Sequence, residues 1–330
     1  MKRALALILV LIICLLAASC ATQYIPVVTT PEPTPEPTPE PFDPTKHTLG
    51  IYGAPDLMAY GFLQTCDELS YNAVILDGDT EDALLWAQKN SGLLIFGAGE
   101  RDRAAINETA AYGAVILTSF FDGTTPKGAK ADLSFSLEHA GLSAAGLLAD
   151  ALDGKEGFLL VCRSEDSPAE SAADKAFREE WARLKGTKEL SKLELLSTEY
   201  CGAEQSAEGA AKGMLERKSS IAGIFACSSH CAEAFCAAVS DAEEKPVIVS
   251  AEASKKSLEL VKSGSLIGTY LSPYNELGKT AAVSMDMLLR EEGEACSDNI
   301  TGIMITASGA NAPDKYISMF SEMEAYLRRK

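Results

Sequence analysis

Two thiols and an imidazole lie close together between residues 227 and 231, where the sequence reads Cys-Ser-Ser-His-Cys. Thiolate and imidazole are ligands that zinc prefers in proteins. The spacing supplies no fourth ligand, however, and Cys227 falls at the end of an apolar run while Cys231 falls where a helix should begin. Cysteine packs well as a small hydrophobic residue. We therefore favour packed cysteines beside a polar loop and expect no metal and no cofactor.

Side chains suited to nucleophilic catalysis are scarce. The three histidines are His47, His139 and His230, and His47 lies in a proline-rich spacer. Neither a Gly-x-Ser-x-Gly elbow nor a phosphate loop occurs, and the run from Gly97 to Glu100 falls short of a dinucleotide-binding fingerprint. The sequence thus favours a protein that is not an enzyme.

Cys20 is the residue with the clearest chemical assignment. A cationic start, Met1-Lys2-Arg3, leads into an uncharged apolar run that closes on Leu-Ala-Ala-Ser-Cys. That run is too short for a membrane span, which needs about 20 apolar residues, but has the length of a signal-peptide core. Its end resembles a bacterial lipobox. We expect residues 1–19 to be a signal peptide and Cys20 to carry a diacylglycerol at the extracytoplasmic face of the cell membrane.

Residues 20–47 have the composition of a stiff spacer. Eight of the 14 prolines precede residue 45, and residues 31–44 read PEPTPEPTPEPFDP. Alternating prolines favour an extended polyproline II segment of about 3.1 Å per residue. The spacer would hold a globular domain away from the membrane.

The remaining residues, 48–330, suffice for two lobes of ordinary size. The formal net charge of the chain is −18. This charge argues against nucleic acid or an anionic membrane surface as the main partner, and we expect a monomer. Seven cysteines follow Cys20, and their irregular spacing favours buried hydrophobic packing over a disulfide framework.

Short apolar runs alternate with amphipathic segments along this domain. The predicted strands are residues 48–52, 73–76, 93–96 and 114–118, and then 157–162, 193–197, 223–226, 247–250 and 266–270. Runs that are apolar on both sides and separated by helices are typical of parallel sheets covered on both faces. The pattern predicts an α/β fold with two doubly wound parallel-sheet lobes. Ligands bind such sheets at the carboxyl ends of strands.

Several segments in this order resemble the type I periplasmic binding proteins, in the sugar-binding branch shared with lactose-repressor-type effector domains. The segments that carry the resemblance are IAGIFA at 221–226, VIVSAE at 247–252, LELVKSG at 258–264 and LSPYNELG at 271–278. The resemblance implies two lobes joined by three crossovers, near residues 133–135, 270–272 and 303–305. The N-terminal lobe would comprise residues 48–134 plus 272–303, and the C-terminal lobe residues 135–271 plus 304–330.

The resemblance also implies a ligand site between the lobes. Glu252 falls where the family has an acidic ligand contact, Ser228 and Ser229 where Asn and Asp are usual, and Ser272 where an amide is common. Residues 171–177 hold no arginine where sugar binders commonly have one, and Arg163 or Lys175 would take its place. Together with polar and aromatic residues of the strand-end loops, the candidate ligand contacts are Tyr52, Asp56, Glu100, Ser119, Phe120, Arg163, Ser228, Ser229, Glu252 and Ser272.

These features predict a lipid-anchored solute-binding protein that captures a small polar ligand, a sugar or a sugar-like molecule, for an ABC permease. A sensor that presents its ligand to a membrane kinase or receptor is the alternative. A surface hydrolase or a structural lipoprotein without a ligand fits the sequence less well.

Replacing Cys20 by serine tests the anchor. The Cys20→Ser chain should move from the membrane fraction to the soluble fraction on cell fractionation, because acyl chains contribute about 0.8 kcal/mol of membrane affinity per buried methylene. Cys14→Ser is the matched control, since Cys14 leaves with the signal peptide, and should stay with the membrane. Equal membrane retention of both variants would exclude lipidation at Cys20.

Overall fold

The computed structural model describes residues 41–120, 122–164, 168–201, 207–218, 220–296, 300–308 and 311–330. The predicted signal peptide, Cys20 and most of the spacer lie outside these residues. Asp43–Lys330 form a compact unit separate from Met1–Phe42. Within the described residues no helix combines the length and the apolar character needed to cross a membrane.

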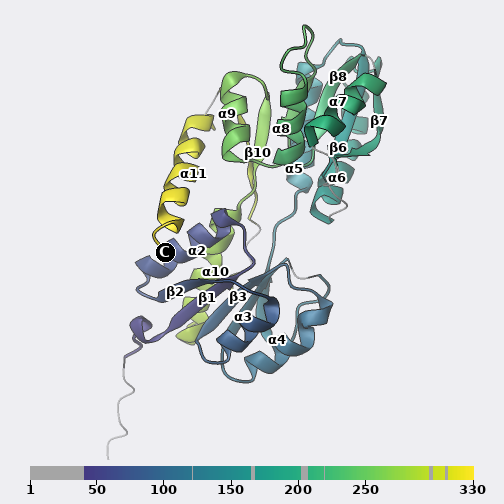
Figure 1. The fold of residues 1–330 in the computed structure, drawn as a ribbon. Coiled ribbons are helices and arrows are strands. Elements are labelled where there is room, and N and C mark those ends of the chain that lie inside the picture. The colour runs from purple at the N-terminus through teal and green to yellow at the C-terminus, as the bar shows by residue number, and fades with distance from the viewer. Residues whose placement is uncertain are drawn as a thin grey trace, which may run out of the picture. The chain divides into compact units, whose positions relative to one another are not determined.

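The first sheet has five parallel strands in the order β2-β1-β3-β4-β5 (Figure 1). Its strands are β1 (Thr48–Tyr52), β2 (Asn72–Leu76), β3 (Gly92–Phe96), β4 (Val115–Ser119) and β5 (Ala129–Leu133). The helices that accompany it are α2 (Asp56–Glu68), α3 (Thr80–Ala87), α4 (Arg103–Ala110) and α10 (Tyr274–Leu289), with short 3-10 turns at η1 (Pro44–Lys46) and η2 (Glu100–Asp102). Apolar side chains of α3 and α4 pack with β3 and β4 in one core cluster.

The second sheet has six strands in the order β11-β10-β9-β8-β6-β7. Its strands are β6 (Gly157–Arg163), β7 (Leu193–Tyr200), β8 (Ile221–Ala226), β9 (Val247–Ser250), β10 (Gly268–Leu271) and β11 (Ile303–Thr306). The helices that follow these strands or precede them are α5 (Glu138–Ala151), α6 (Pro168–Lys185), α7 (Ala207–Arg217), α8 (Ser229–Ala238), α9 (Lys255–Ser263) and α11 (Pro313–Leu327). All pairs are parallel except β10 with β11.

Neighbouring residues of β8 point into two different cores. Phe225 stacks on Phe177 of α6 with ring centroids 4.4 Å apart, whereas Ile224 joins the cluster formed by α7, α8 and α9. Side chains of a strand alternate between the two faces of its sheet. The second sheet is therefore covered on both faces, and the prediction of doubly wound α/β lobes is confirmed.

Two strands were not predicted from the sequence. β5 carries polar residues and lies at an edge of the first sheet, so its apolar pattern is weak. β11 falls where a crossover was expected, and it pairs antiparallel with β10 at an edge of the second sheet. An antiparallel edge strand is a common addition to a parallel sheet.

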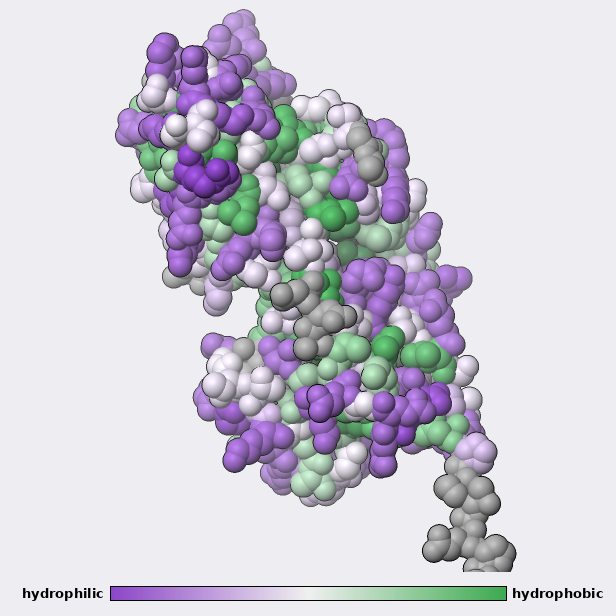
Figure 2. All heavy atoms as spheres, turned by 180° about the vertical axis from the view of Figure 1, so that it is seen from behind, coloured by the Kyte–Doolittle hydropathy of each residue, from purple (hydrophilic) through white to green (hydrophobic). Residues whose placement is uncertain are grey.

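The surface is mostly hydrophilic on the face that Figure 2 shows, and hydrophobic residues appear there in small patches. The large exposed hydrophobic residues belong to several different elements: Val74, Ile75, Leu85, Tyr112, Leu142, Tyr200 and Val283. Single exposed hydrophobic residues are ordinary on folded proteins and mark no interface by themselves.

Helices α2 and α10 approach each other through glycines. A Cβ atom at Gly278 would lie 2.1 Å from the carbonyl oxygen of Met58, and one at Gly61 would lie 2.2 Å from that of Asn275. No side chain fits at either distance. This contact attaches α10, which follows β10 of the second sheet, to α2 of the first sheet.

The Gly278→Ala variant should lose stability, because the methyl group forces the two helix backbones apart. We expect the free energy of unfolding to fall by about 1–3 kcal/mol, measured by urea denaturation. Gly146→Ala in α5 is the control, since a Cβ there meets nothing within 4 Å, and alanine favours a helix over glycine by up to about 1 kcal/mol. A Gly278→Ala variant as stable as the control would contradict the close packing.

Candidate functional site

Glu252 follows the carboxyl end of β9, and hydrogen bonds hold its backbone. Its carbonyl oxygen accepts from Ser250 Oγ at 2.7 Å and from Thr269 Oγ1 at 2.8 Å. Its own N–H donates to Ser250 Oγ at 3.2 Å. Both hydroxyl groups belong to buried residues, so Glu252 is placed by the sheet and not by a loose loop.

The Glu252 carboxylate faces the start of α8. Its Oε2 accepts from the backbone N–H of Ser229 at 3.4 Å and from Ser229 Oγ at 3.3 Å. Burial raises the pKa of Glu252, the two bonds from Ser229 oppose that rise, and the negative charge of Glu170 adds to it. The N-terminal end of a helix favours a negative charge. The carboxylate is thus a strong hydrogen-bond acceptor with capacity for a further donor.

A cavity of about 350 Å³ opens beside this carboxylate. Its lining comes from the start of α2, the loops after β9 and β10, and α11: Pro55, Asp56, Leu57, Ser229, Glu252, Ala253, Ser254, Lys255, Leu271, Ser272, Tyr274, Phe320, Met323 and Glu324. Small-molecule sites in proteins occupy about 300–1,000 Å³. The volume suits a ligand of few heavy atoms, and the lining offers both acceptors and apolar surface.

Aromatic rings meet beside the cavity, at the carboxyl ends of the first sheet. Tyr274 at the start of α10 contacts Phe135 edge to face, with ring centroids 5.0 Å apart, and Phe120 contacts Phe135 at 4.9 Å. Phe96 at the end of β3 joins them at 5.4 Å from Phe120. Burial and the charge of Glu252 raise the pKa of Tyr274 to about 12. Tyr274 therefore stays a neutral phenol that can donate a hydrogen bond.

Four of the residues predicted from the sequence line this one cavity: Asp56, Ser229, Glu252 and Ser272. Phe120 reaches it indirectly, because its ring lies 6.4 Å from that of Tyr274. Phe120 has a φ of +55°, a conformation that L residues rarely adopt. Such strained residues cluster at functional sites, so Phe120 belongs with the aromatic border of the cavity.

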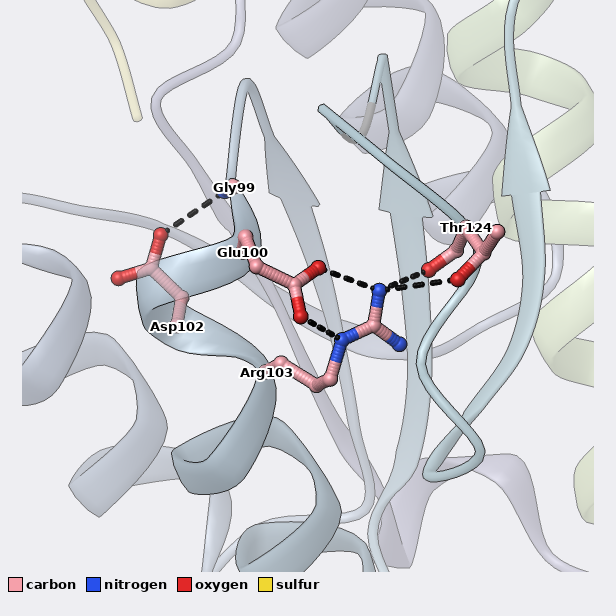
Figure 3. A network of polar contacts seen from close by, with 5 residues as sticks. All are labelled: Gly99, Glu100, Asp102, Arg103 and Thr124. Atoms are coloured by element: carbon pink, nitrogen blue, oxygen red, sulfur yellow. Dashed lines mark hydrogen bonds and ion pairs between the residues drawn. The ribbon is translucent and has the colours of Figure 1, made fainter.

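The other predicted residues of the first sheet have partners within the protein. Glu100 forms a two-pronged pair with Arg103, at 2.6 and 2.7 Å, and Arg103 also donates to the carbonyl oxygen of Thr124 (Figure 3). Ser119 is fully buried and donates to the carbonyl oxygen of Leu133 at 2.6 Å. The Tyr52 hydroxyl donates to the carbonyl oxygen of Gly78 at 3.4 Å. The structure does not bring these three residues to the cavity.

Two predicted residues of the second lobe also have hydrogen-bond partners within the protein. Ser228 caps α8, because its Oγ accepts from the Cys231 N–H at 3.3 Å. Arg163 is 6 % exposed, donates to Ser171 Oγ at 2.6 Å and lies over the Tyr200 ring. Neither lines the cavity. Their contact with a ligand stays a prediction.

Sequence reasoning missed Tyr274, Phe96, Phe135 and Glu170 as members of this region. Tyr274 lies in a segment whose family resemblance was recognised, Phe96 ends a predicted strand, and Phe135 lies in a predicted crossover. An aromatic residue at a strand's carboxyl end was the available signal. Glu170 gave none: it lies within α6, where its carboxylate accepts hydrogen bonds from the backbone N–H and the hydroxyl of Ser164.

A larger hollow of about 480 Å³ lies elsewhere, between α8 and α9. It includes Val247 at the first residue of β9 and Ile267 just before β10. It therefore opens at the amino ends of these strands, away from the loops that follow their carboxyl ends. Position favours the smaller cavity beside Glu252 as the ligand site.

All seven cysteines beyond residue 20 lie within described residues, and all are free thiols. Six are buried, and Cys296 is partly exposed. Six of the seven therefore pack in the interior as small buried residues, as predicted, and the absence of a disulfide framework stays a prediction.

Two α/β lobes with a small cavity at strand carboxyl ends define a two-lobed ligand-binding protein of the type I periplasmic class. The family model described as "Periplasmic binding protein domain" matches residues 94–294. The chain belongs to this family.

Solved structures share the fold at low sequence identity. A sugar ABC transporter sugar-binding protein from Bacillus halodurans is 19% identical, with a TM-score of 0.67 over 82% of this chain and 99% of that one. A solute-binding protein from Burkholderia graminis in complex with D-arabinose is 14% identical, with a TM-score of 0.65 over 81% and 97%. The chain in the XylFII–LytSN complex is 16% identical, with a TM-score of 0.62 over 81% of this chain and 98% of that one. No curated protein sequence matches the chain.

The raised pKa of Glu252 predicts how pH affects stability. A carboxyl group whose pKa is higher folded than unfolded destabilises the fold increasingly as pH rises from its unfolded pKa, about 4.3, to its folded value. Glu252→Gln should therefore be more stable than wild type at neutral pH, by about 1 kcal/mol, and this advantage should vanish near pH 4. Thermal unfolding across pH measures it.

The exposed Glu259 of α9 supplies the control for this experiment. Glu259→Gln should follow the wild-type pH profile, because a solvated carboxyl group gains little from losing its charge. A Glu252→Gln profile parallel to that of wild type from pH 4 to pH 8 would show that Glu252 carries no burial penalty.

Proposed function

We propose that this protein is a monomeric, extracytoplasmic solute-binding protein, held at the membrane by lipid on Cys20, that captures a neutral sugar or sugar-like ligand for an ABC permease. The observation that carries the proposal is the convergence of Glu252, Ser229, Ser272 and Tyr274 on one cavity of about 350 Å³. The role is binding and release of an unaltered ligand.

The cavity chemistry suits a polyol. A carboxylate accepts hydrogen bonds from sugar hydroxyls, serine hydroxyls both donate and accept, and a neutral phenol donates. Aromatic and apolar side chains such as Tyr274 and Phe320 can cover the C–H face of a sugar ring. Because a buried ligand must have its polar groups paired, several convergent groups of this kind are needed.

The charges at the cavity favour a neutral ligand over an anion. Asp56, Glu252 and Glu324 contribute three carboxylates, and Lys255 is the cation in the lining. The Lys255 ammonium lies 3.1 Å from the Glu324 carboxylate, so its charge is already compensated. A sugar acid or a sugar phosphate would meet an excess of negative charge. These groups instead match uncharged hydroxyls.

The structural relatives support a sugar ligand and a transport role. One relative is a sugar-binding protein of a sugar ABC transporter, and another was crystallised with D-arabinose. Similarity at this level of identity establishes the fold, so ligand and permease are proposed from the cavity together with these relatives.

A sensor role is the second candidate. It is favoured by the similarity to XylFII, which occurs in a complex with LytSN. Crosslinking of the protein in its native membrane, followed by mass spectrometry, separates the two roles: a permease partner supports transport, and a membrane kinase or receptor supports sensing.

The ligand prediction is tested with a panel of neutral monosaccharides and their acid and phosphate derivatives. We expect a neutral sugar to raise the melting temperature, and the matching acid and phosphate to have no effect. For a sugar that binds, calorimetry should show that Glu252→Gln weakens affinity by about 10-fold to 100-fold, since a hydrogen bond to a charged group contributes about 1.5–3 kcal/mol.

Glu100→Gln is the matched control, because Glu100 pairs with Arg103 outside the cavity lining. Its affinity should equal that of wild type. If Glu252→Gln kept full affinity while Glu100→Gln lost it, the ligand would bind at the loop after β3 and the assignment of the cavity would be wrong. Recovery of a chemically altered sugar would contradict the binding role.

A further inference from the structure

Three cysteines that lie far apart in the sequence meet in the second lobe. Cys162 Sγ lies 3.2 Å from Cys201 Sγ and 3.8 Å from Cys231 Sγ. All three sulfur atoms lie within 4.8 Å of one another, and all three residues are buried. Among the described residues, no other group of three or more potential metal ligands meets this criterion.

The backbone fixes the three residues independently. Cys162 belongs to β6, and its carbonyl oxygen accepts from the Cys227 N–H at 2.8 Å. The Cys201 N–H donates to the carbonyl oxygen of Arg163 at 2.9 Å. Cys231 lies in the first turn of α8, held by the Ser228 cap. A triangle of sulfurs on two strand ends and a helix start is preorganised, as a metal site requires.

We propose that Cys162, Cys201 and Cys231 bind one thiophilic metal cation, zinc or copper(I), as thiolates. Sulfur is the donor that these cations prefer. Sulfurs that share a tetrahedral zinc at about 2.3 Å lie roughly 3.8 Å apart. The Cys162–Cys231 separation has this value, and the Cys162–Cys201 pair reaches it by opening about half an ångström. Each thiol releases its proton to solvent or buffer as the metal enters.

The surroundings of the three sulfurs include one feature that favours negative charge and one that opposes it. Cys231 lies at the N-terminal end of α8, where the helix dipole favours negative charge. The carboxylate of Glu170 lies near Cys201, and its negative charge disfavours further negative charge on the cluster. A cation that neutralises the thiolates is therefore favoured over three thiolates alone.

A disulfide between Cys162 and Cys201 is the competing outcome. It would need an external oxidant, such as a disulfide-carrying thiol oxidoreductase, to accept two electrons and two protons. It would leave Cys231 without a role, although Cys231 is the third sulfur of the triangle. Metal binding uses all three sulfurs.

Metal titration of the purified full chain tests the proposal. The protein is reduced, stripped with a chelator and titrated separately with zinc and with copper(I). We expect one ion per chain for at least one of the metals. Cys162→Ala, Cys201→Ala and Cys231→Ala should each weaken binding more than about 10-fold, the lower bound for losing even an outer-shell group.

Cys236→Ala is the matched control, because Cys236 lies in the same helix as Cys231 and its Sγ contacts the carbonyl oxygen of Ser265 instead. Its metal affinity should equal that of wild type. Circular dichroism of every variant separates loss of metal from loss of fold. Equal losses in Cys236→Ala and the three cluster variants would overturn the proposal.

X-ray absorption of the metal-loaded wild type needs no variant. The expected first shell is dominated by sulfur, at about 2.3 Å for zinc. A first shell of nitrogen and oxygen alone would overturn the assignment, as would failure of the reduced wild-type protein to bind either metal. So would a Cys162–Cys201 disulfide, found by mass spectrometry in unreduced protein, that cannot be replaced by metal after reduction.

Discussion

Parallel pairing of β6, β8 and β9 is the constraint on which the site depends. In register, Cys162 pairs with Ala226, and Ala226 pairs with Ser250, so three strands end at one level. The loops that follow must therefore leave the sheet side by side. Glu252 lies in one of these loops and Ser229 begins α8 directly after another, so the register brings the two residues within hydrogen-bonding distance.

Retaining a partly buried carboxylate at this edge works against stability. A charged group loses hydration when it is buried, and the two bonds from Ser229, at 3.3 and 3.4 Å, are long. The protein compensates through the backbone, where Ser250 and Thr269 hold the Glu252 carbonyl at 2.7 and 2.8 Å. A firmly placed but weakly satisfied carboxylate is the arrangement expected of a group reserved for a ligand.

The sequence allowed most of the architecture to be predicted, because each central strand is apolar on both sides. Strand β1 has the predicted bounds, Thr48–Tyr52, and β9 the predicted bounds, Val247–Ser250. Strand β5 escaped prediction because it carries polar residues, whereas β11 is apolar but lies where a crossover was expected. Glu252 could be singled out, since its segment resembles a known family.

Other parts of the site depend on contacts that spacing does not reveal. Arg163 and Ser228 looked like ligand groups by position, yet burial and capping give them partners within the fold. The Cys231 thiol was weighed with Cys227 and His230, its neighbours in the sequence. In space it contacts the thiol of Cys162, at 3.8 Å, which lies 69 positions away. Only the fold brings such residues together.

The start of α8 links the two groups that the second lobe builds. Ser228 caps the helix by accepting from Cys231, and Ser229 donates to Glu252 from the adjacent position. A cation held by Cys231 would fix the first helical turn, and with it the N–H that faces the carboxylate. The same turn then carries both Cys231 of the sulfur triangle and the Ser229 N–H that donates to Glu252 at the cavity. Only two positions separate Ser229, which contacts Glu252, from Cys231 of the sulfur triangle.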